Sequence, residues 1–146
     1  GWASYVEVHS YEYNNNNNDN LNTLAKCNYA LTLCLHAIGD IGVNYYGWDE
    51  ARLSSYLSNW GFNSPDTAHW MYTALIANPG NYCKYVLGFI GFEELKKQAQ
   101  KDLGSDFSLK EFHRYILETG PVQFDILFSN LKEWEESLVV VSSRAA

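Results

Sequence analysis

Apolar side chains recur at intervals of three and four residues through most of this chain, and that spacing is the strongest constraint on its fold. Between residues 21 and 43, such side chains would line one face of a long helix and lie in the core: Leu24, Cys27, Leu31, Cys34, Leu35 and Ile38. The same spacing runs from Phe124 to Leu138, whereas no alternation typical of strands follows residue 13. The sequence therefore predicts an all-α protein, with about seven helices packed as an irregular bundle.

Signals for helix starts and ends divide the rest of the chain. Ser64 and Pro65 suit the cap and first turn of a helix that ends near Ala77. Ser108 and Glu111 form a capping box at the start of another helix. Helices are thus expected over 48–60, 65–77, 80–103 and 109–119, and from 124 onwards.

The residue content of three further segments predicts their burial or conformation. The helix over 80–103 is apolar nearly all round between 82 and 92, which predicts central burial. Residues 2–13 suit a strand by their Val and Tyr content and a helix by their spacing. The Asn-rich run 14–20 favours turns, so we expect a surface loop there.

With 146 residues and 47% hydrophobic content, the chain suits a single domain over 1–146.

Charge and hydropathy exclude two classes of partner. The net charge is −7, whereas phosphate binding requires clustered Lys and Arg, so we expect no nucleic-acid partner. The longest aliphatic run, from Leu138 to Val141, is far shorter than the roughly 20 residues that cross a bilayer. We therefore expect no membrane span.

The three cysteines are expected to be buried free thiols. Cys27 and Cys34 stand seven positions apart, about 10 Å along a helix, which is too far for a disulfide. Cys83 is the third. No Cys or His spacing typical of a structural zinc site is present.

Four blocks of the sequence are similar, in order and spacing, to one bacterial family. They are Gly1 to Glu7, Asp40 to Trp48, Pro79 to Gly88, and the run from Leu103 to Leu127 that contains Phe112-His113. Together they resemble the family catalogued as domain of unknown function 885, over roughly residues 1–134. The resemblance favours a helix over 2–13.

This resemblance implies the C-terminal part of a zinc metallopeptidase-like protein with a larger, helical zincin-like fold. Its zinc would be held by an HExxH motif and by a Glu that directly precedes Gly1, and neither is present in these residues. We therefore expect no metal ligand in this chain, and zinc only in a catalytic full-length parent. The chain would form a wall of the cleft for a peptide substrate and be inactive by itself.

The sequence departs from the family at polar positions. A family Arg and His are here His36 and Asn44, an Arg-Tyr pair is Ala74-Leu75, a Lys is Val86, and an Asp is Arg114. Apolar and glycine positions are kept, as expected if the fold is retained while the chemistry relaxes. The alternative interpretation is therefore a non-catalytic relative that acts as a structural or binding module.

Tyr85 and Glu7 are the leading candidates for a role in the parent's site. Tyr85 matches a family Tyr that would stabilise an oxyanion or contact substrate, and the alternative is a core Tyr with one hydrogen bond. Glu7 would lie two helical turns after the missing Glu, on the same face. There it would orient a zinc-binding His by a hydrogen bond, and the alternative is a solvated or ion-paired carboxylate.

His36, Asp40 and Asn44 are further candidates for contacts with substrate or with its ligands. His36 either replaces the family Arg and faces the substrate, or is a satisfied buried histidine. Asp40 either orients its neighbours or serves as a cap or salt-bridge partner near a helix end. Asn44 stands where the family has His.

The expected partner is the N-terminal half of the parent, which would cover apolar surface on this chain. Without that half, we expect the exposed surface to drive self-association into a dimer or larger oligomer. The resemblance implies a bacterial protein, either cytoplasmic or exported, because a targeting signal would lie upstream.

Overall fold

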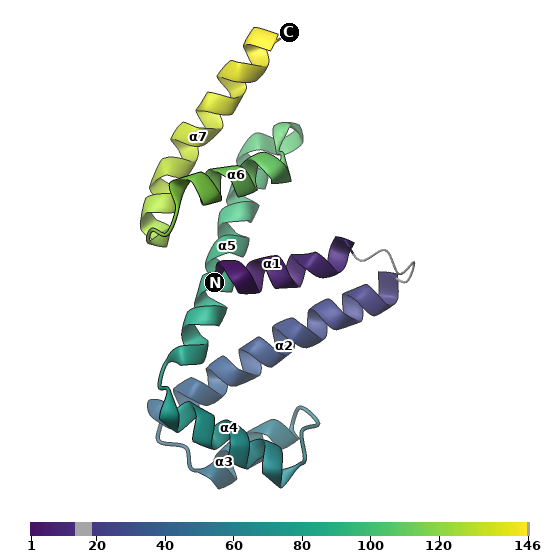
Figure 1. The fold of residues 1–146 in the computed structure, drawn as a ribbon, viewed down its shortest axis with the longest axis vertical. Helices are drawn as coiled ribbons and strands as arrows, with labels where there is room; N and C mark the ends of the chain where they lie inside the picture. The colour runs from purple at the N-terminus through teal and green to yellow at the C-terminus, as the bar shows by residue number, and fades with distance from the viewer. Residues whose placement is uncertain (14–18, 146) are drawn as a thin grey trace. The chain divides into compact units, whose positions relative to one another are not determined.

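The computed structural model describes residues 1–13 and 19–145, with the side chains described as far as residue 138. These residues form seven α-helices and two single-turn 3₁₀ helices and contain no strand, so the all-α prediction is confirmed. The α-helices are α1 (Trp2–Ser10), α2 (Asp19–Asn44), α3 (Glu50–Ser58), α4 (Pro65–Ala77), α5 (Asn81–Leu103), α6 (Leu109–Thr119) and α7 (Phe124–Ala145) (Figure 1). The 3₁₀ helices are η1 (Tyr11–Tyr13) and η2 (Gly104–Asp106).

The chain divides into two compact units, Gly1–Ile90 and Gly91–Ala146. That the whole chain forms a single domain stays a prediction. None of the helices over the described residues is long and apolar enough to span a bilayer.

The sequence placed most helix boundaries within a few residues, and one detail was wrong. Asp19 and Asn20 open α2 instead of ending a loop, because an acidic side chain in the first turn is stabilised by the helix dipole. The remainder of that predicted loop, 14–18, lies outside the described residues. Ser64 occupies the cap position of α4, but its side chain makes no capping hydrogen bond.

Two other helix caps are made by side chains. Ser108 accepts a hydrogen bond from the backbone N–H of Glu111 at 3.4 Å, as the capping box predicts. Asp49, which the sequence reading did not single out, accepts one from the backbone N–H of Arg52 at 2.8 Å and starts α3.

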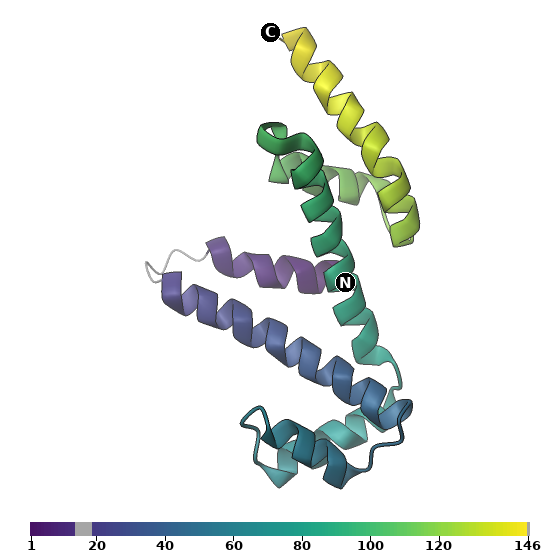
Figure 2. The ribbon, with the colours of Figure 1, turned by 180° about the vertical axis from the view of Figure 1, so that it is seen from behind.

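The core of the first unit lies where α3 and α4, side by side, meet the C-terminal end of α2 (Figures 1 and 2). Its buried side chains are Val43, Leu53, Leu57, Ala68, Met71 and Leu75. Gly39 of α2 makes this close approach possible, because an added Cβ there would lie 2.8 Å from the Met71 side chain. Such a contact is too short for a real Cβ unless the neighbour moves.

The second unit is built from the C-terminal part of α5 with α6 and α7. Its buried apolar side chains are Leu95, Ala99, Leu103, Phe112, Tyr115, Ile116, Leu127 and Leu131. The Tyr115 hydroxyl donates a hydrogen bond to the Leu127 carbonyl at 2.7 Å and ties α6 to α7. The Tyr115 ring also stacks on Trp134, with centroids 4.9 Å apart.

Two predictions of burial are wrong. The apolar face of α2 is largely exposed, with Leu24 at 65% and Cys27 and Cys34 also exposed, although Leu35 is buried. The face of α2 that enters the core is lined instead by smaller residues, including Ala37 and Gly39, because they let α4 pack closely.

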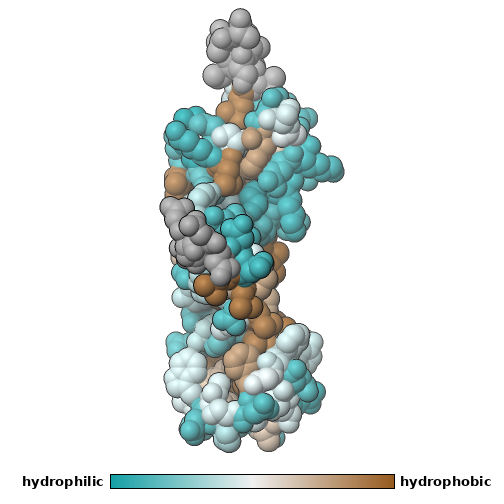
Figure 3. Space-filling view, turned by 90° about the vertical axis from the view of Figure 1, so that its right-hand side faces the viewer, coloured by the Kyte–Doolittle hydropathy of each residue, from teal (hydrophilic) through white to brown (hydrophobic). Residues whose placement is uncertain are grey.

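The expected central burial of α5 also fails in its first half. Leu87 is 67% exposed and Tyr85 is 37% exposed, whereas Val86 is buried. Cys83 is only half-buried. Apolar side chains thus reach the surface of the protein, as the brown areas among hydrophilic teal in Figure 3 show.

Candidate functional site

Three helices of the first unit bring Glu7 and Tyr85 to the neighbourhood of Tyr29. Glu7 and the buried Ser4 come from α1, Tyr29 from α2 and Tyr85 from α5. Burial is the main cause that raises the pKa of Tyr29, and the nearby Glu7 carboxylate raises it further. A hydrogen bond with Ser4 lowers this pKa, whereas Tyr11 and then Tyr85 raise it. Ser4, Glu7, Tyr29 and Tyr85 are called the tyrosine cluster below.

One close backbone contact joins the residue before α1 to α5. Gly1 and Gly88 meet backbone to backbone, since a Cβ added to Gly88 would lie 2.5 Å from the Gly1 Cα. Tyr5 is completely buried, and its ring centroid lies 4.6 Å from that of His9. With this face of α1 buried, Glu7 is left exposed to solvent.

The cluster can donate hydrogen bonds from phenols beside an exposed carboxylate. A tyrosine hydroxyl is protonated at neutral pH and can act as a donor, and the raised pKa of Tyr29 extends this state to higher pH. The Lys84 ammonium lies 5.5 Å from the centre of the Tyr85 ring and adds a positive charge on the same helix. Such a set suits contact with a polar ligand such as a carbonyl oxygen.

Tyr29 is the member of this cluster that the sequence reading missed. The available signal was weak: Tyr29 is an aromatic residue in the long helix that stands off the apolar 3–4 spacing. Such a position is also typical of a solvent-exposed tyrosine, so the partners from α1 and α5 were needed to reveal it.

Asp40 and Asn44 form a second group, which joins α2 to the turn between α4 and α5. Asp40 is 1% exposed. Its Oδ1 accepts hydrogen bonds from Asn44 Nδ2 and from the Gly80 N–H, both at 2.8 Å. Its Oδ2 accepts one from the Tyr82 N–H at 3.0 Å. The Asn44 amide also donates to the Leu75 carbonyl at 3.1 Å.

These contacts give Asp40 and Asn44 a structural task. A carboxylate at the N-terminus of α5 also interacts favourably with the dipole of that helix. The expected contacts of both residues with substrate stay predictions.

His36 lies one helical turn before Asp40 on the same face of α2. Its Nδ1 donates a hydrogen bond to the Thr32 carbonyl at 2.8 Å, and its ring centroid lies 4.6 Å from that of Tyr82. Together with Trp70, it lines a small apolar cavity of about 70 Å³. The candidates thus fall into two groups: Glu7 and Tyr85 near Tyr29, and His36, Asp40 and Asn44 along α2.

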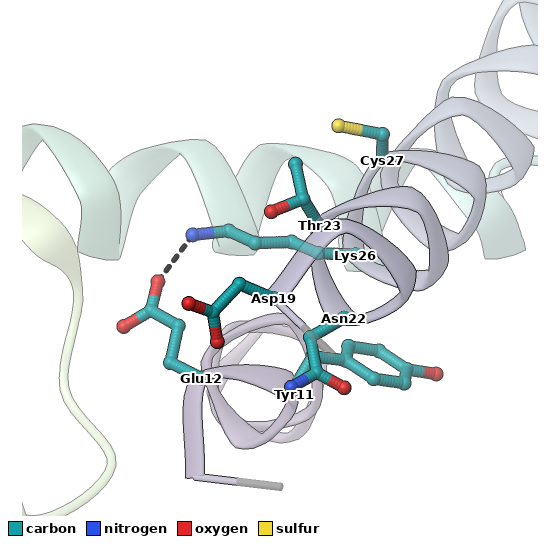
Figure 4. A pocket seen from close by; sticks show the side chains of 7 residues that line it. All are labelled: Tyr11, Glu12, Asp19, Asn22, Thr23, Lys26 and Cys27. Atoms are coloured by element: carbon teal, nitrogen blue, oxygen red, sulfur yellow. Dashed lines mark hydrogen bonds and ion pairs between the residues drawn. The ribbon is translucent and has the colours of Figure 1, made fainter. Parts of the chain in front are cut away.

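A larger pocket, of about 490 Å³, lies between η1 and the first turns of α2 (Figure 4). Glu12 and Lys26 form an ion pair across it, and His9 Nδ1 lies 3.2 Å from the same Glu12 oxygen. Burial by itself would raise the pKa of Glu12, but Lys26 and His9 outweigh burial and lower it. The charges of Glu12 and Lys26 are thus already paired within this pocket.

The donor set does not fit a metal site. Within residues 1–13 and 19–145, no three His, Cys, Asp or Glu side chains come together in an arrangement that could hold a metal ion.

Comparison with models of known protein families gives a match. The model of a family described as "Bacterial protein of unknown function (DUF885)" matches residues 1–131. Neither the curated proteins nor the solved structures give a significant match.

Proposed function

This chain belongs to the DUF885 family of bacterial proteins, and from that premise we propose that it is the helical wall of the substrate cleft in a zinc-dependent metallopeptidase-like protein. The observation that carries this proposal is the convergence of Glu7 and Tyr85, from α1 and α5, near Tyr29. Both were selected from sequence blocks far apart in the chain, and each acts electrostatically on the same residue, Tyr29.

In this proposal, Tyr85 donates a hydrogen bond to the carbonyl oxygen of a peptide substrate, or to the oxyanion that develops from it. Glu7 accepts a hydrogen bond from a metal-binding side chain and fixes its orientation. Zinc, when bound in the full-length protein, would polarise the substrate carbonyl and activate water. Its ligands would come from the N-terminal half of the parent, so this chain alone is inactive.

The test uses the full-length protein with a library of short peptides as substrates. Tyr85→Phe should lower kcat by roughly 100-fold, because it removes one donor from the oxyanion, and should leave the zinc content by mass spectrometry unchanged. Tyr45→Phe is the matched control, since Tyr45 is 80% exposed and lies outside the tyrosine cluster. Equal activity of Tyr85→Phe and wild type would contradict the role given to Tyr85.

A titration of this chain with zinc tests the role of the missing half. We expect no binding tighter than about micromolar by calorimetry, because no complete ligand set is assembled here. Sub-micromolar binding at a stoichiometry of one would place metal ligands within this chain and contradict the proposal.

A second candidate function is a non-catalytic structural or binding module. It is favoured by Asn44, which stands at the position of the family His and uses its amide to bind Asp40 and the Leu75 carbonyl. A side chain engaged in this way serves the fold. An intact HExxH motif upstream, together with peptide hydrolysis by the full-length protein, would exclude this alternative.

A further inference from the structure

The pocket between η1 and the first turns of α2 plays no part in the proposed function (Figure 4). It is called the η1 pocket below, and its lining includes Tyr11 and Glu12 of η1 and Asp19, Thr23 and Lys26 of α2. Its volume of about 490 Å³ is in the range of cavities that bind small molecules. Polar side chains from two elements line it, so its composition suits a polar ligand.

The charges around the η1 pocket do not cancel. Glu12 and Lys26 form an ion pair, and Figure 4 draws the Asp19 carboxylate beside that of Glu12. No hydrogen bond or ion pair joins Asp19 to another residue that the structure describes. Two carboxylates and one ammonium sum to −1, and this sum stays negative after the roughly half positive charge of a helix N-terminus is added. The pocket therefore attracts a cation.

The ion pair of Glu12 and Lys26 narrows the kind of ligand. The Lys26 ammonium, which an anion would need, is already bound by Glu12. A divalent metal ion would be repelled by the same ammonium, and no third His, Cys, Asp or Glu joins the two carboxylates among the described residues. An organic cation, in contrast, brings N–H donors to Asp19 and apolar atoms to the rest of the lining.

We propose that the η1 pocket binds the guanidinium group of a small molecule or of an arginine side chain. A planar guanidinium can donate two parallel hydrogen bonds to the Asp19 carboxylate, and its face can rest on the ring of Tyr11. A primary ammonium is a point charge without this fork, so it should bind more weakly. The ion pair of Glu12 and Lys26 ties η1 to α2 and thus joins the two elements that form the pocket.

NMR titration of this chain with N-acetyl-arginine methylamide tests the proposal. The titration runs to about 20 mM, because a small ligand in an open pocket should bind with a Kd on the order of 1 mM. It is done at pH 8, which keeps histidine side chains neutral. We expect saturable shifts of the backbone amides near Asp19 and Lys26. N-acetyl-citrulline methylamide, which has the same shape without the charge, should cause no saturable shift.

Two substitutions should change the affinity in opposite directions. Asp19→Asn should weaken binding about tenfold, because it removes a charge-assisted acceptor. Lys26→Met should strengthen binding by roughly threefold, because it removes a like charge and frees the Glu12 carboxylate. Asp66→Asn is the matched control: Asp66 is an exposed carboxylate in the first turn of another helix, α4, so the affinity should not change. Circular dichroism confirms that each variant keeps its helices.

A second ligand distinguishes the two sources of guanidinium. If n-butylguanidinium binds as tightly as N-acetyl-arginine methylamide, the pocket recognises a free guanidinium compound. If the arginine derivative binds several times more tightly, the pocket recognises arginine within a peptide. Butylammonium should be the weakest of the three.

Three outcomes would overturn the proposal: equal responses to the arginine and citrulline derivatives, equal affinities of Asp19→Asn and wild type, or weaker binding by Lys26→Met. The titration involves neither zinc nor peptide hydrolysis. Its outcome is therefore independent of the proposed function.

Discussion

Asp40 Oδ1 accepts a hydrogen bond from the backbone N–H of Gly80 at 2.8 Å, across forty positions of sequence. Its second oxygen holds the N–H of Tyr82 in the first turn of α5. A buried carboxylate on α2 thus fixes the start of α5, one turn before Tyr85. The position of a candidate site residue therefore depends on a side chain from another helix.

Asp40→Asn should lower the free energy of unfolding by about 2 kcal/mol, because hydrogen bonds to a charged acceptor are lost and an amide N–H replaces one acceptor. Urea denaturation followed by circular dichroism measures the change. Asp49→Asn is the matched control, since Asn caps a helix about as well as Asp, and it should change stability little. Equal effects of the two substitutions would show that the Asp40 contacts contribute no measurable extra stability.

Gly88→Ala should separate α1 from α5. The new Cβ would lie 2.5 Å from the Gly1 Cα, and backbone cannot move aside as a flexible side chain can. We expect a loss of about 1–3 kcal/mol from overpacking, in spite of the roughly 1 kcal/mol by which Ala favours a helix over Gly. A variant at least as stable as wild type in urea would show that this close approach is not maintained in solution.

Glu7→Gln should lower the pKa of Tyr29 towards its ordinary value. Burial is the main cause that raises this pKa, and the Glu7 carboxylate adds to it, so removing that charge makes the phenolate easier to form. NMR titration of chains with labelled tyrosine, assigned with Tyr29→Phe, would follow the change. Glu118→Gln on α6 serves as the control and should leave the Tyr29 titration unchanged. An unchanged titration in Glu7→Gln would show that the Glu7 carboxylate does not affect the pKa of Tyr29.

The buried position of Glu135 predicts that the stability of the second unit depends on pH. It is 8% exposed, and its Oε1 has no hydrogen-bond partner. Burial, and then the Asp102 carboxylate, raises its pKa. A raised pKa means that the folded state holds the proton more tightly, so stability is greatest below the ordinary value of about 4.3. That stability is lost as pH rises through the folded-state pKa.

Glu135→Gln should therefore be more stable than wild type at pH 7, on the order of 1 kcal/mol, with the difference vanishing towards pH 4. Thermal melts from pH 4 to pH 8 measure it. Glu136→Gln provides the control, because Glu136 is the exposed neighbour on the same helix. A constant difference between Glu135→Gln and wild type across this range would rule out titration of Glu135 as the cause.

Helix positions were predictable because residues close in sequence determine where each helix begins and ends. Pro65 at a first turn and the Asn78-Pro79-Gly80 stop gave the bounds of α4, which the structure confirms. The buried face of α2 was not predictable in the same way. Leu and Ile outrank Gly and Ala on any hydropathy scale, yet Gly39 is buried because the Met71 side chain needs its space.

The candidate site was predictable only in part, for a related reason. Glu7 and Tyr85 were found through the resemblance, and the structure shows both close to Tyr29. Tyr29 itself carries no local signal, since its importance comes from α1 and α5 approaching α2. Contacts between helices distant in sequence are set by tertiary packing, which spacing within one helix does not report.

The hydrogen bonds of Asp40 also constrain the sequences of the two helices that they join to different degrees. Both donors from the start of α5 are main-chain N–H groups, which any residue except proline supplies. The acceptor, in contrast, exists only as long as position 40 carries a suitable side chain. Under random sequence drift, position 82 can therefore change without loss of these bonds, whereas a change at position 40 removes them together.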